Sequence, residues 1–380
     1  MKKGFLLAFL LVVILVVSSI MASSSEPIKL GLVGPMTGPL APYGEGVRDG
    51  ALLAVEQINS QGGINGRQVE LIVLDNQANP QETITLVNRL IQREGIVGLI
   101  GPVISSTSMV AGPVVQRQGI PMISPTATAV DVTLQGDFVF RVCYLDDYQG
   151  LAAVNYAVDD LGAKKAGILF KVGDAYSEGL RVVFRDNFQA AGGEVVELAY
   201  NLGDTDFSAQ LTRMKDQGVE VVYSPFYYED AVLALTQAES IGLDAIFIGG
   251  DGWDAQELLD QAGLAAVNSV FTTHYSTSDS RSVVQGFLSN FQGKFGRPPI
   301  VLAALGYDAA ALMMDAVERA GSDNPREIRD AIAATQGFEG ITGQSISLDE
   351  DGNPVKDITI IRVVNVEDNP QFEFVTQVGY

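Results

Sequence analysis

The chain of 380 residues is long enough for two domains of ordinary size, and 47% of its residues are hydrophobic, enough to fill two cores. Its formal net charge of −22 at pH 7 disfavours nucleic acid and anionic membrane surfaces as partners, because both carry negative charge themselves. The single Cys143 excludes an intramolecular disulfide, and the single His274 leaves no His/Cys cluster for structural zinc. We therefore expect no metal, no cofactor and no nucleic-acid partner.

The amino terminus has the layout of a secretory signal. Two lysines precede an apolar run from Phe5 to Val17, and small polar residues follow as far as Ser25. The alternative is an uncleaved membrane anchor, because the stretch from Phe5 to Met21 approaches the ~20 residues that span a bilayer. In either case residues 1–25 place the folded part of the chain outside the cytoplasm.

The first folded segment, Ile28 to Asp75, predicts one βαβ unit. An apolar strand at Ile28–Val33 is followed by the loop GPMTGPLAPYG, a helix with apolar residues at helical spacing, and a second strand at Val69–Leu74. The alternation then continues with helices at 81–93 and 106–117 and strands at 96–100, 120–124 and 138–142. We place a lobe boundary after the last of these strands.

A second series of similar units follows. The first expected helix spans 148–161, the second follows the loop GDAYSEG and ends at about 190, the third begins after Asp206 and the fourth begins at about Asp230. Strands are expected at 166–172, 194–200, 219–224 and 245–249. Strands that alternate with helices of this length indicate parallel sheets with helices on both faces. Two such series predict two similar doubly wound α/β lobes.

The end of the chain breaks this rhythm. A strand at 270–275 is followed by three helices at 282–295, 301–320 and 325–335, and then by strands at 345–348 and 358–366. A helical block after the second series is more than one lobe needs. We therefore expect the chain to return to the first lobe and to cross again near 349–356.

Polar and aromatic side chains collect just beyond the ends of the predicted strands, where open α/β sheets bind ligands. They are Tyr43, Ser105, Ser106, Thr126, Thr128, Tyr176, Tyr227, Tyr228, Asp251 and Trp253. Each has an ordinary alternative: the serines or Asp251 could cap helices, the threonines could form turns, and the tyrosines could pack at a rim. These alternatives do not explain why all the groups share one end of two sheets.

The set suits a small zwitterion. Hydroxyl and backbone N–H groups at the start of a helix favour a carboxylate, and an aspartate across a cleft favours an ammonium. Val103, Ile104, Trp253 and the tyrosines would surround an aliphatic or aromatic side chain.

Catalytic interpretations fit poorly. The chain has no GxSxG, HExxH or CxxC motif. The glycines of GEGVRDG, at Gly44–Gly50, have the wrong spacing and position for a dinucleotide fingerprint. Asp146 and Asp147 are adjacent and rarely would face one site, so we interpret them as a solvated lobe junction.

The candidate site residues lie in segments that resemble the periplasmic leucine/isoleucine/valine-binding proteins of ABC importers, which have the type I periplasmic binding fold. The resemblance covers nearly all of the chain after the signal, with GPMTGPLAPYGEGVRDGALLAVEQINSQGGINGRQVEL, IGPVISSTS, ISPTATAVDVT, FRVCYLDDYQG, AYSEGL, DFSAQL and YDAA in the family's order. It implies two lobes joined by three crossovers. Lobe 1 would comprise 26–146 and 276–354, and lobe 2 would comprise 147–275 and 355–380.

The resemblance also implies roles for single residues. Ser105 and Thr128 would bind a ligand carboxylate, while the Thr126 carbonyl and Asp251 would face its ammonium. The remaining wall positions would be Tyr43, Val103, Ile104, Ala127, Tyr176, Tyr227, Trp253 and Tyr307. Branched-chain binders of this family carry Glu where this chain has Asp251, so the ammonium site is expected to differ in shape.

The function implied is binding rather than catalysis. The chain would be a monomeric, extracytoplasmic protein that closes its lobes on a branched-chain amino acid and delivers it to the permease subunits of an ABC importer. The alternative is a sensory binding protein that reports an amino acid, amide or small carboxylate to a receptor.

Overall fold

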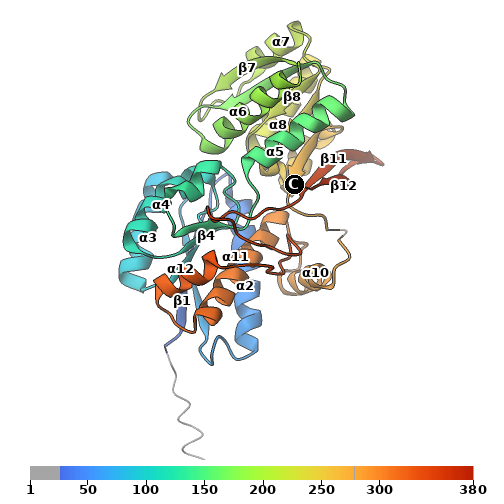
Figure 1. Ribbon diagram of the computed structural model, residues 1–380. Coiled ribbons are helices and arrows are strands. Elements are labelled where there is room, and N and C mark those ends of the chain that lie inside the picture. The colour runs from blue at the N-terminus through green and yellow to red at the C-terminus, as the bar shows by residue number, and fades with distance from the viewer. Residues whose placement is uncertain (1–25, 278, 380) are drawn as a thin grey trace, which may run out of the picture.

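A computed structural model describes residues 26–277 and 279–379, and the predicted signal or anchor at 1–25 lies outside this part of the chain. The described chain forms two α/β lobes, one above the other in Figure 1. None of the described helices combines the length and the apolar character that a membrane span requires.

The first lobe is built on a five-stranded parallel sheet with the order β2-β1-β3-β4-β5. Strands β3, β4 and β5 are buried along their whole length, as expected for a sheet covered by helices on both faces. The elements are β1 Ile28–Gly34, α2 Ala41–Ser60, β2 Val69–Asp75, α3 Pro80–Arg89, η1 Leu90–Glu94, β3 Gly98–Ile100, α4 Ser105–Gln118, β4 Met122–Ser124, η2 Val130–Gln135 and β5 Val139–Arg141.

The second lobe repeats this arrangement. Its sheet has the order β7-β6-β8-β9-β10-β11-β12, and the first five strands are parallel and follow the order of the first lobe. The elements are α5 Asp146–Asn155, η3 Tyr156–Asp160, β6 Lys165–Lys171, α6 Ala175–Ala190, β7 Glu194–Tyr200, α7 Ser208–Asp216, β8 Val221–Ser224, α8 Tyr228–Ile241, β9 Ile246–Gly249, η4 Asp251–Trp253, α9 Gln256–Ala262, η5 Gly263–Ala266 and β10 Val270–Thr273.

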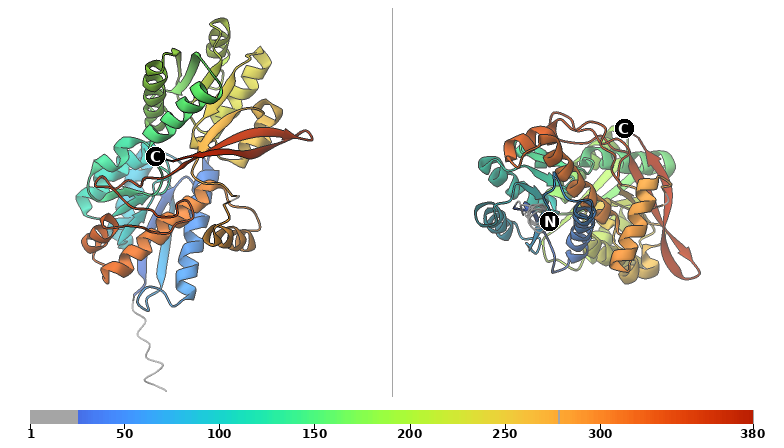
Figure 2. Two further views of the ribbon diagram at one scale, coloured as in Figure 1. Left: turned by 45° about the vertical axis from the view of Figure 1, so that its right-hand side comes forward. Right: turned by 90° about the horizontal axis from the view of Figure 1, so that it is seen from below.

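The chain passes between the lobes three times. It leaves the first sheet after β5, returns after β10, and crosses again before β11. The returning block packs on the first lobe, where α11 lies along α2 (Figures 1 and 2). Its elements are α10 Ser282–Phe295, α11 Val301–Ala320 and α12 Pro325–Ala333, and the chain ends with β11 Ile358–Val366 and β12 Asn369–Val378. The predicted fold of two doubly wound lobes and three crossovers is confirmed.

The last glycine of GEGVRDG, Gly50, serves helix packing together with Gly306 of α11. A Cβ atom on Gly50 would lie 1.8 Å from the carbonyl oxygen of Ala303, and one on Gly306 would lie 2.3 Å from that of Val47. Glycine at both positions lets α2 and α11 approach to backbone contact. This close packing explains Gly50 without a nucleotide.

At the end of the chain one strand was not predicted and one predicted strand is wrong. Strand β12 was not expected, yet it forms an antiparallel hairpin with β11, which itself runs antiparallel to β10 (Figure 2). The expected strand at 345–348 is absent from the described chain, where only isolated bridges such as Phe338 to Ile346 form. The buried Asp308 carboxylate instead accepts from the backbone N–H groups of Ile341, at 2.7 Å, and Thr342, at 2.9 Å. Within 345–348 the N–H groups of Ile346 and Leu348 donate to the carbonyl oxygens of Phe338, at 2.7 Å, and Thr335, at 3.2 Å, so these donors are satisfied without a sheet ladder.

Candidate functional site

The cleft between the lobes contains a cavity of about 20 Å³. Both lobes contribute to its wall, each with residues that follow its strands or begin its helices. The lining residues are Tyr43, Val103, Ile104, Ser105, Thr126 and Leu302 from the first lobe and Tyr176, Tyr227, Asp251 and Gly252 from the second. The cavity has room for about one water molecule, so a larger ligand must enter while the lobes stand apart.

The N-terminus of α4 lies at this cavity. Ser105 is the first residue of the helix, and no side chain caps the helix, so the capping alternative for Ser105 and Ser106 is wrong at α4. The Ser105 hydroxyl accepts a long hydrogen bond of 3.4 Å from the Ala129 N–H group and also lines the cavity. The helix dipole and the hydroxyl together favour an anionic group at this point.

The loop after β4 supports the same wall. The Thr126 hydroxyl donates to the Val103 carbonyl oxygen at 2.5 Å and so ties the two loops together. Ala127 and Thr128 are also buried, but they are not among the residues that line the cavity. The Thr128 hydroxyl faces the Asp146 carboxyl group without reaching hydrogen-bonding geometry, so this buried polar atom has no partner among the described residues.

Three tyrosines form an aromatic wall. The rings of Tyr176 and Tyr227 are stacked, with centroids 5.2 Å apart, and the Tyr43 ring lies 5.9 Å from that of Tyr227. The Tyr43 hydroxyl donates to the Gly252 carbonyl oxygen on the other lobe. The neighbouring Tyr228 does not line the cavity, and its hydroxyl instead donates to a loop carbonyl in the first lobe at 2.7 Å.

Asp251 places a carboxylate on the cavity wall. Its Oδ1 accepts from the Tyr176 hydroxyl at 2.9 Å and from Gln149 Nε2 at 3.2 Å, and its Oδ2 contacts His274 Nε2 at 2.9 Å. The Asp251 side chain caps no helix, so the alternative that Asp251 serves as a helix cap is wrong. In the described chain only His274 lies within ion-pair distance of Asp251, and burial lowers the pKa of that histidine. A buried carboxylate with polar support but no full positive charge suits a cationic ligand group.

The lobes also meet beside the cavity. The Ser106 hydroxyl, on the first lobe, donates to Asp174 Oδ2 and accepts from the Ala175 N–H group, both at 3.2 Å. Asp174 in turn caps α6 by accepting from the Ser177 N–H group at 2.9 Å. Ser106 therefore binds across the cleft to the start of a helix in the other lobe, and this contact belongs to a closed arrangement.

The interpretation of Asp146 and Asp147 as a solvated junction is wrong for one of the two. Asp147 is exposed, but Asp146 is only 1% exposed and its Oδ1 accepts from Gln149 Nε2 at 2.7 Å. Burial, together with the nearby charge of Asp251, raises the pKa of Asp146 to about 8. The sequence could not show this, because burial follows from how the crossover packs against the second lobe.

We expect Asp146→Asn to reduce the pH dependence of stability. The pKa of the Asp146 carboxyl rises from about 4 in the unfolded chain to about 8 in the folded protein. Its contribution to stability is therefore complete below about pH 4 and is lost progressively as the pH rises to about 8. The free energy of unfolding of the wild type should therefore fall between pH 5 and pH 9 by an extra amount on the order of several kcal/mol relative to the variant. Denaturant unfolding at both pH values measures this difference, and parallel profiles would contradict it.

Two predicted site residues lie elsewhere. Trp253 is completely buried within the second lobe, where its Nε1 donates to the Ser224 carbonyl oxygen at 3.1 Å. Tyr307 lies between α2 and α10, where its hydroxyl donates to Gln57 Oε1 at 2.6 Å and its ring packs against Phe287. Neither lines the cavity.

Other residues at the cavity or behind it were not predicted. Leu302 and Gly252 line it, while Gln149 and His274 hold Asp251 from behind. In the sequence His274 was considered as a possible zinc ligand, and Leu302 belongs to a helix more than 200 residues from β1 along the chain. Only the folded chain brings them together.

Comparison with known proteins decides the family. A family model described as periplasmic binding protein matches residues 27–369. This chain belongs to the periplasmic binding protein family. The predicted resemblance to its leucine/isoleucine/valine-binding branch is also confirmed, since relatives with such names match most of the chain.

Three comparisons describe the relatives of this periplasmic binding protein. The leucine-, isoleucine-, valine-, threonine-, and alanine-binding protein of Pseudomonas aeruginosa is 32% identical over 87% of this chain and 88% of its own length. The leucine-binding protein LivK of Thermotoga maritima is 33% identical, with a TM-score of 0.88 over 93% of this chain and 99% of that one. LivJ of Streptococcus pneumoniae, solved with isoleucine, is 33% identical, with a TM-score of 0.85 over 92% of this chain and 99% of that one.

Proposed function

We propose that this chain is the extracytoplasmic substrate-binding protein of an ABC importer and that it binds branched-chain α-amino acids in the cleft between its lobes. It acts by binding rather than by catalysis, as a monomer, and passes its ligand to permease subunits. Lobe 1 comprises 26–146 and 276–354, and lobe 2 comprises 147–275 and 355–380. The predicted signal at 1–25 and the names of its relatives support this role.

One observation supports an α-amino acid as the class of ligand. Asp251 on the second lobe and the N-terminus of α4 on the first lobe line the same cavity, so a carboxylate and an anion-binding helix end face one small space. A zwitterion satisfies both, because its ammonium pairs with Asp251 and its carboxylate binds at Ser105. We assign the buried Thr128 hydroxyl, which has no hydrogen-bond partner among the described residues, to the same carboxylate, and this requires Thr128 to move into the cavity wall when ligand binds.

The remaining wall favours a branched aliphatic side chain. Val103, Ile104 and Leu302 are apolar and buried, and the rings of Tyr43 and Tyr227 close the other side. Burying a leucine-sized side chain against such a surface contributes about 2 kcal/mol. A charged side chain would lose its hydration without a partner.

Binding by hinge closure follows from the cleft. The cavity is too small to admit an amino acid from solvent, and direct hydrogen bonds such as that between Ser106 and Asp174 hold the lobes together. Ligand therefore binds an open form and stabilises the closed form through contacts with both lobes.

Calorimetry tests this function. The purified protein, unfolded and refolded to remove bound ligand, should bind leucine, isoleucine or valine at one site, while lysine and glutamate should not bind. Binding of only organic acids that lack an amino group would contradict the proposed ligand class.

A further inference from the structure

Asp251 is held in place by side chains that do not themselves line the cavity. Of its three side-chain partners only Tyr176 reaches the wall, while Gln149 and His274 lie behind it. Both are buried, at 0% and 1% exposure. Gln149 lies in α5, the helix that follows the first crossover, and His274 follows β10, where the chain leaves the second sheet. The position of the carboxylate therefore depends on residues outside the binding surface.

Gln149 has all of its hydrogen-bonding capacity in use. Its Nε2 donates to Asp146 Oδ1 at 2.7 Å and to Asp251 Oδ1 at 3.2 Å, and its Oε1 accepts from the Asp251 N–H group at 3.2 Å and from Thr272 Oγ1 at 2.9 Å. An amide offers two donors and two acceptors, so each has a partner here. This single side chain fixes both the backbone and the carboxylate of Asp251 relative to α5 and β10.

His274 supports the other carboxylate oxygen. It follows β10 directly, and its ring stacks on Tyr144 of the first crossover with centroids 3.8 Å apart. Because burial lowers the pKa of the ring, its neutral form has one N–H group, and the contact of 2.9 Å with Asp251 Oδ2 places that group at Nε2. The ring thus donates to Asp251 without neutralising it.

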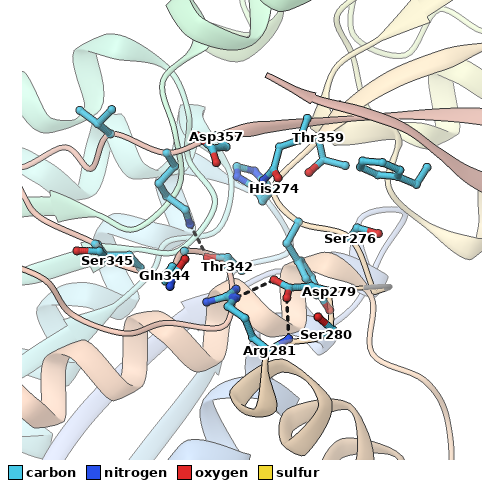
Figure 3. A pocket seen from close by; sticks show the side chains of 17 residues that line it. His274, Ser276, Asp279, Ser280, Arg281, Thr342, Gln344, Ser345, Asp357 and Thr359 are labelled. Atoms are coloured by element: carbon cyan, nitrogen blue, oxygen red, sulfur yellow. Dashed lines mark hydrogen bonds and ion pairs between the residues drawn. The ribbon is translucent and has the colours of Figure 1, made fainter. Parts of the chain in front are cut away.

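The same histidine reaches a second cavity. Figure 3 shows His274 beside Thr359 at this pocket. The pocket has a volume of about 620 Å³, and its lining includes 274–276 and 279–281 from the second crossover, 342–346, and 355–357 with Thr359 from the third crossover. His274 therefore lies between the ammonium-binding carboxylate and the hinge, and it connects the position of Asp251 to the crossover segments.

We propose that Gln149 and His274 are positioning residues that set the preference of the cleft for an α-amino group, by holding Asp251 in the orientation that meets the ligand ammonium. The inference rests on the proposed function. Without these donors the buried carboxylate would lose two of its three side-chain hydrogen bonds and turn from the cavity, and discrimination against ligands that lack the ammonium would fall.

Paired titrations test the inference. Gln149→Met and His274→Met remove the donors at similar side-chain volume, and affinities are measured for leucine and for its hydroxy-acid analogue, which has a hydroxyl in place of the ammonium. We expect the affinity ratio of leucine to analogue to fall at least about tenfold in each variant, equivalent to 1.4 kcal/mol. His274→Gln, which can place an amide donor near the Nε2 position, should restore most of the ratio.

A milder pair of variants applies if the methionine variants fail to fold. Thr272→Val removes the hydroxyl that orients the Gln149 amide, and we expect it to lower the ratio several-fold. Thr273→Val is its matched control, because that neighbouring hydroxyl donates to Asp254 Oδ2 at 2.6 Å and not to Gln149. The control should leave the ratio unchanged.

The outcomes separate the two proposals. If the wild type binds leucine but the affinity ratio of leucine to analogue is unchanged in all variants, whether or not both affinities fall, the positioning role is overturned. A wild type that binds no amino acid would overturn the proposed function itself.

Discussion

Replacing Asp251 by asparagine should weaken leucine binding at least about 30-fold, equivalent to about 2 kcal/mol. The substitution preserves the size of the side chain and leaves Tyr176, Gln149 and His274 with a polar partner. It removes the negative charge that would pair with the ligand ammonium in a site with little water. Calorimetric titration of wild type and variant measures the loss.

The hydroxy-acid analogue of leucine is the control for this variant. It has no ammonium, so Asp251→Asn should leave its affinity unchanged or raise it, because an unpaired carboxylate no longer faces a neutral hydroxyl. If leucine bound the variant as tightly as the wild type, Asp251 would not contact the ammonium and the orientation proposed for the ligand would be wrong.

The double variant Ser105→Ala, Thr128→Ala should reduce leucine affinity more than about 100-fold, because a hydrogen bond to a charged group contributes about 1.5–3 kcal/mol. Both hydroxyls are buried near the start of α4, and neither donates a hydrogen bond to a described residue. In the proposed complex both hydroxyls donate to the ligand carboxylate, and the Thr128 hydroxyl turns from Asp146 toward the cavity to do so. The same titration, with each single variant alongside, measures the two contributions.

Ser108→Ala provides a matched control on the same helix. Its hydroxyl is buried, but it donates to the Pro102 carbonyl oxygen at 2.9 Å and is not part of the cavity wall. This variant should lose stability and keep its leucine affinity. Retention of tight leucine binding by the double variant would place the ligand carboxylate elsewhere in the cleft.

Local signals in the sequence predicted most of the elements. Strand β7 and helices α10 and α11 have the bounds expected from their apolar periodicity, and other helices begin or end within a few residues of the expected positions. Helix α2 starts earlier, at Ala41, inside a segment expected to be loop, because Pro42 is well suited to the first turn of a helix. Strand β12 was missed because Glu367 and Asp368 form its turn with positive φ, where Asn-Gly or Asp-Gly would have signalled a hairpin.

The structure brings some of the predicted site residues together at the cavity and places others elsewhere. Tyr43, Ser105, Tyr176, Tyr227 and Asp251 follow strands or begin helices, and the structure brings these residues together at one cavity. Trp253 also follows a strand, but a bulky ring with one polar atom packs inward when a carbonyl is available to accept from it. Position along a strand predicts proximity to the cleft but does not determine the direction of the side chain.

The supporting residues could not be predicted from the sequence at all. Gln149 is 102 residues from Asp251, and the partner of His274 depends on how β10 lies beside the strand that leads to η4. Such contacts are products of topology, because the parallel order of the strands brings these loops to one edge of the sheet. For this reason the specificity of the cleft can be understood only in the folded chain.

A crystal structure of the protein with L-leucine tests the central claim most directly. The account predicts the ligand nitrogen within roughly 3.2 Å of an Asp251 carboxylate oxygen and the ligand carboxylate at a similar distance from the Ser105 hydroxyl at the start of α4. A ligand bound in the reverse orientation, or outside the cleft between the lobes, would contradict it.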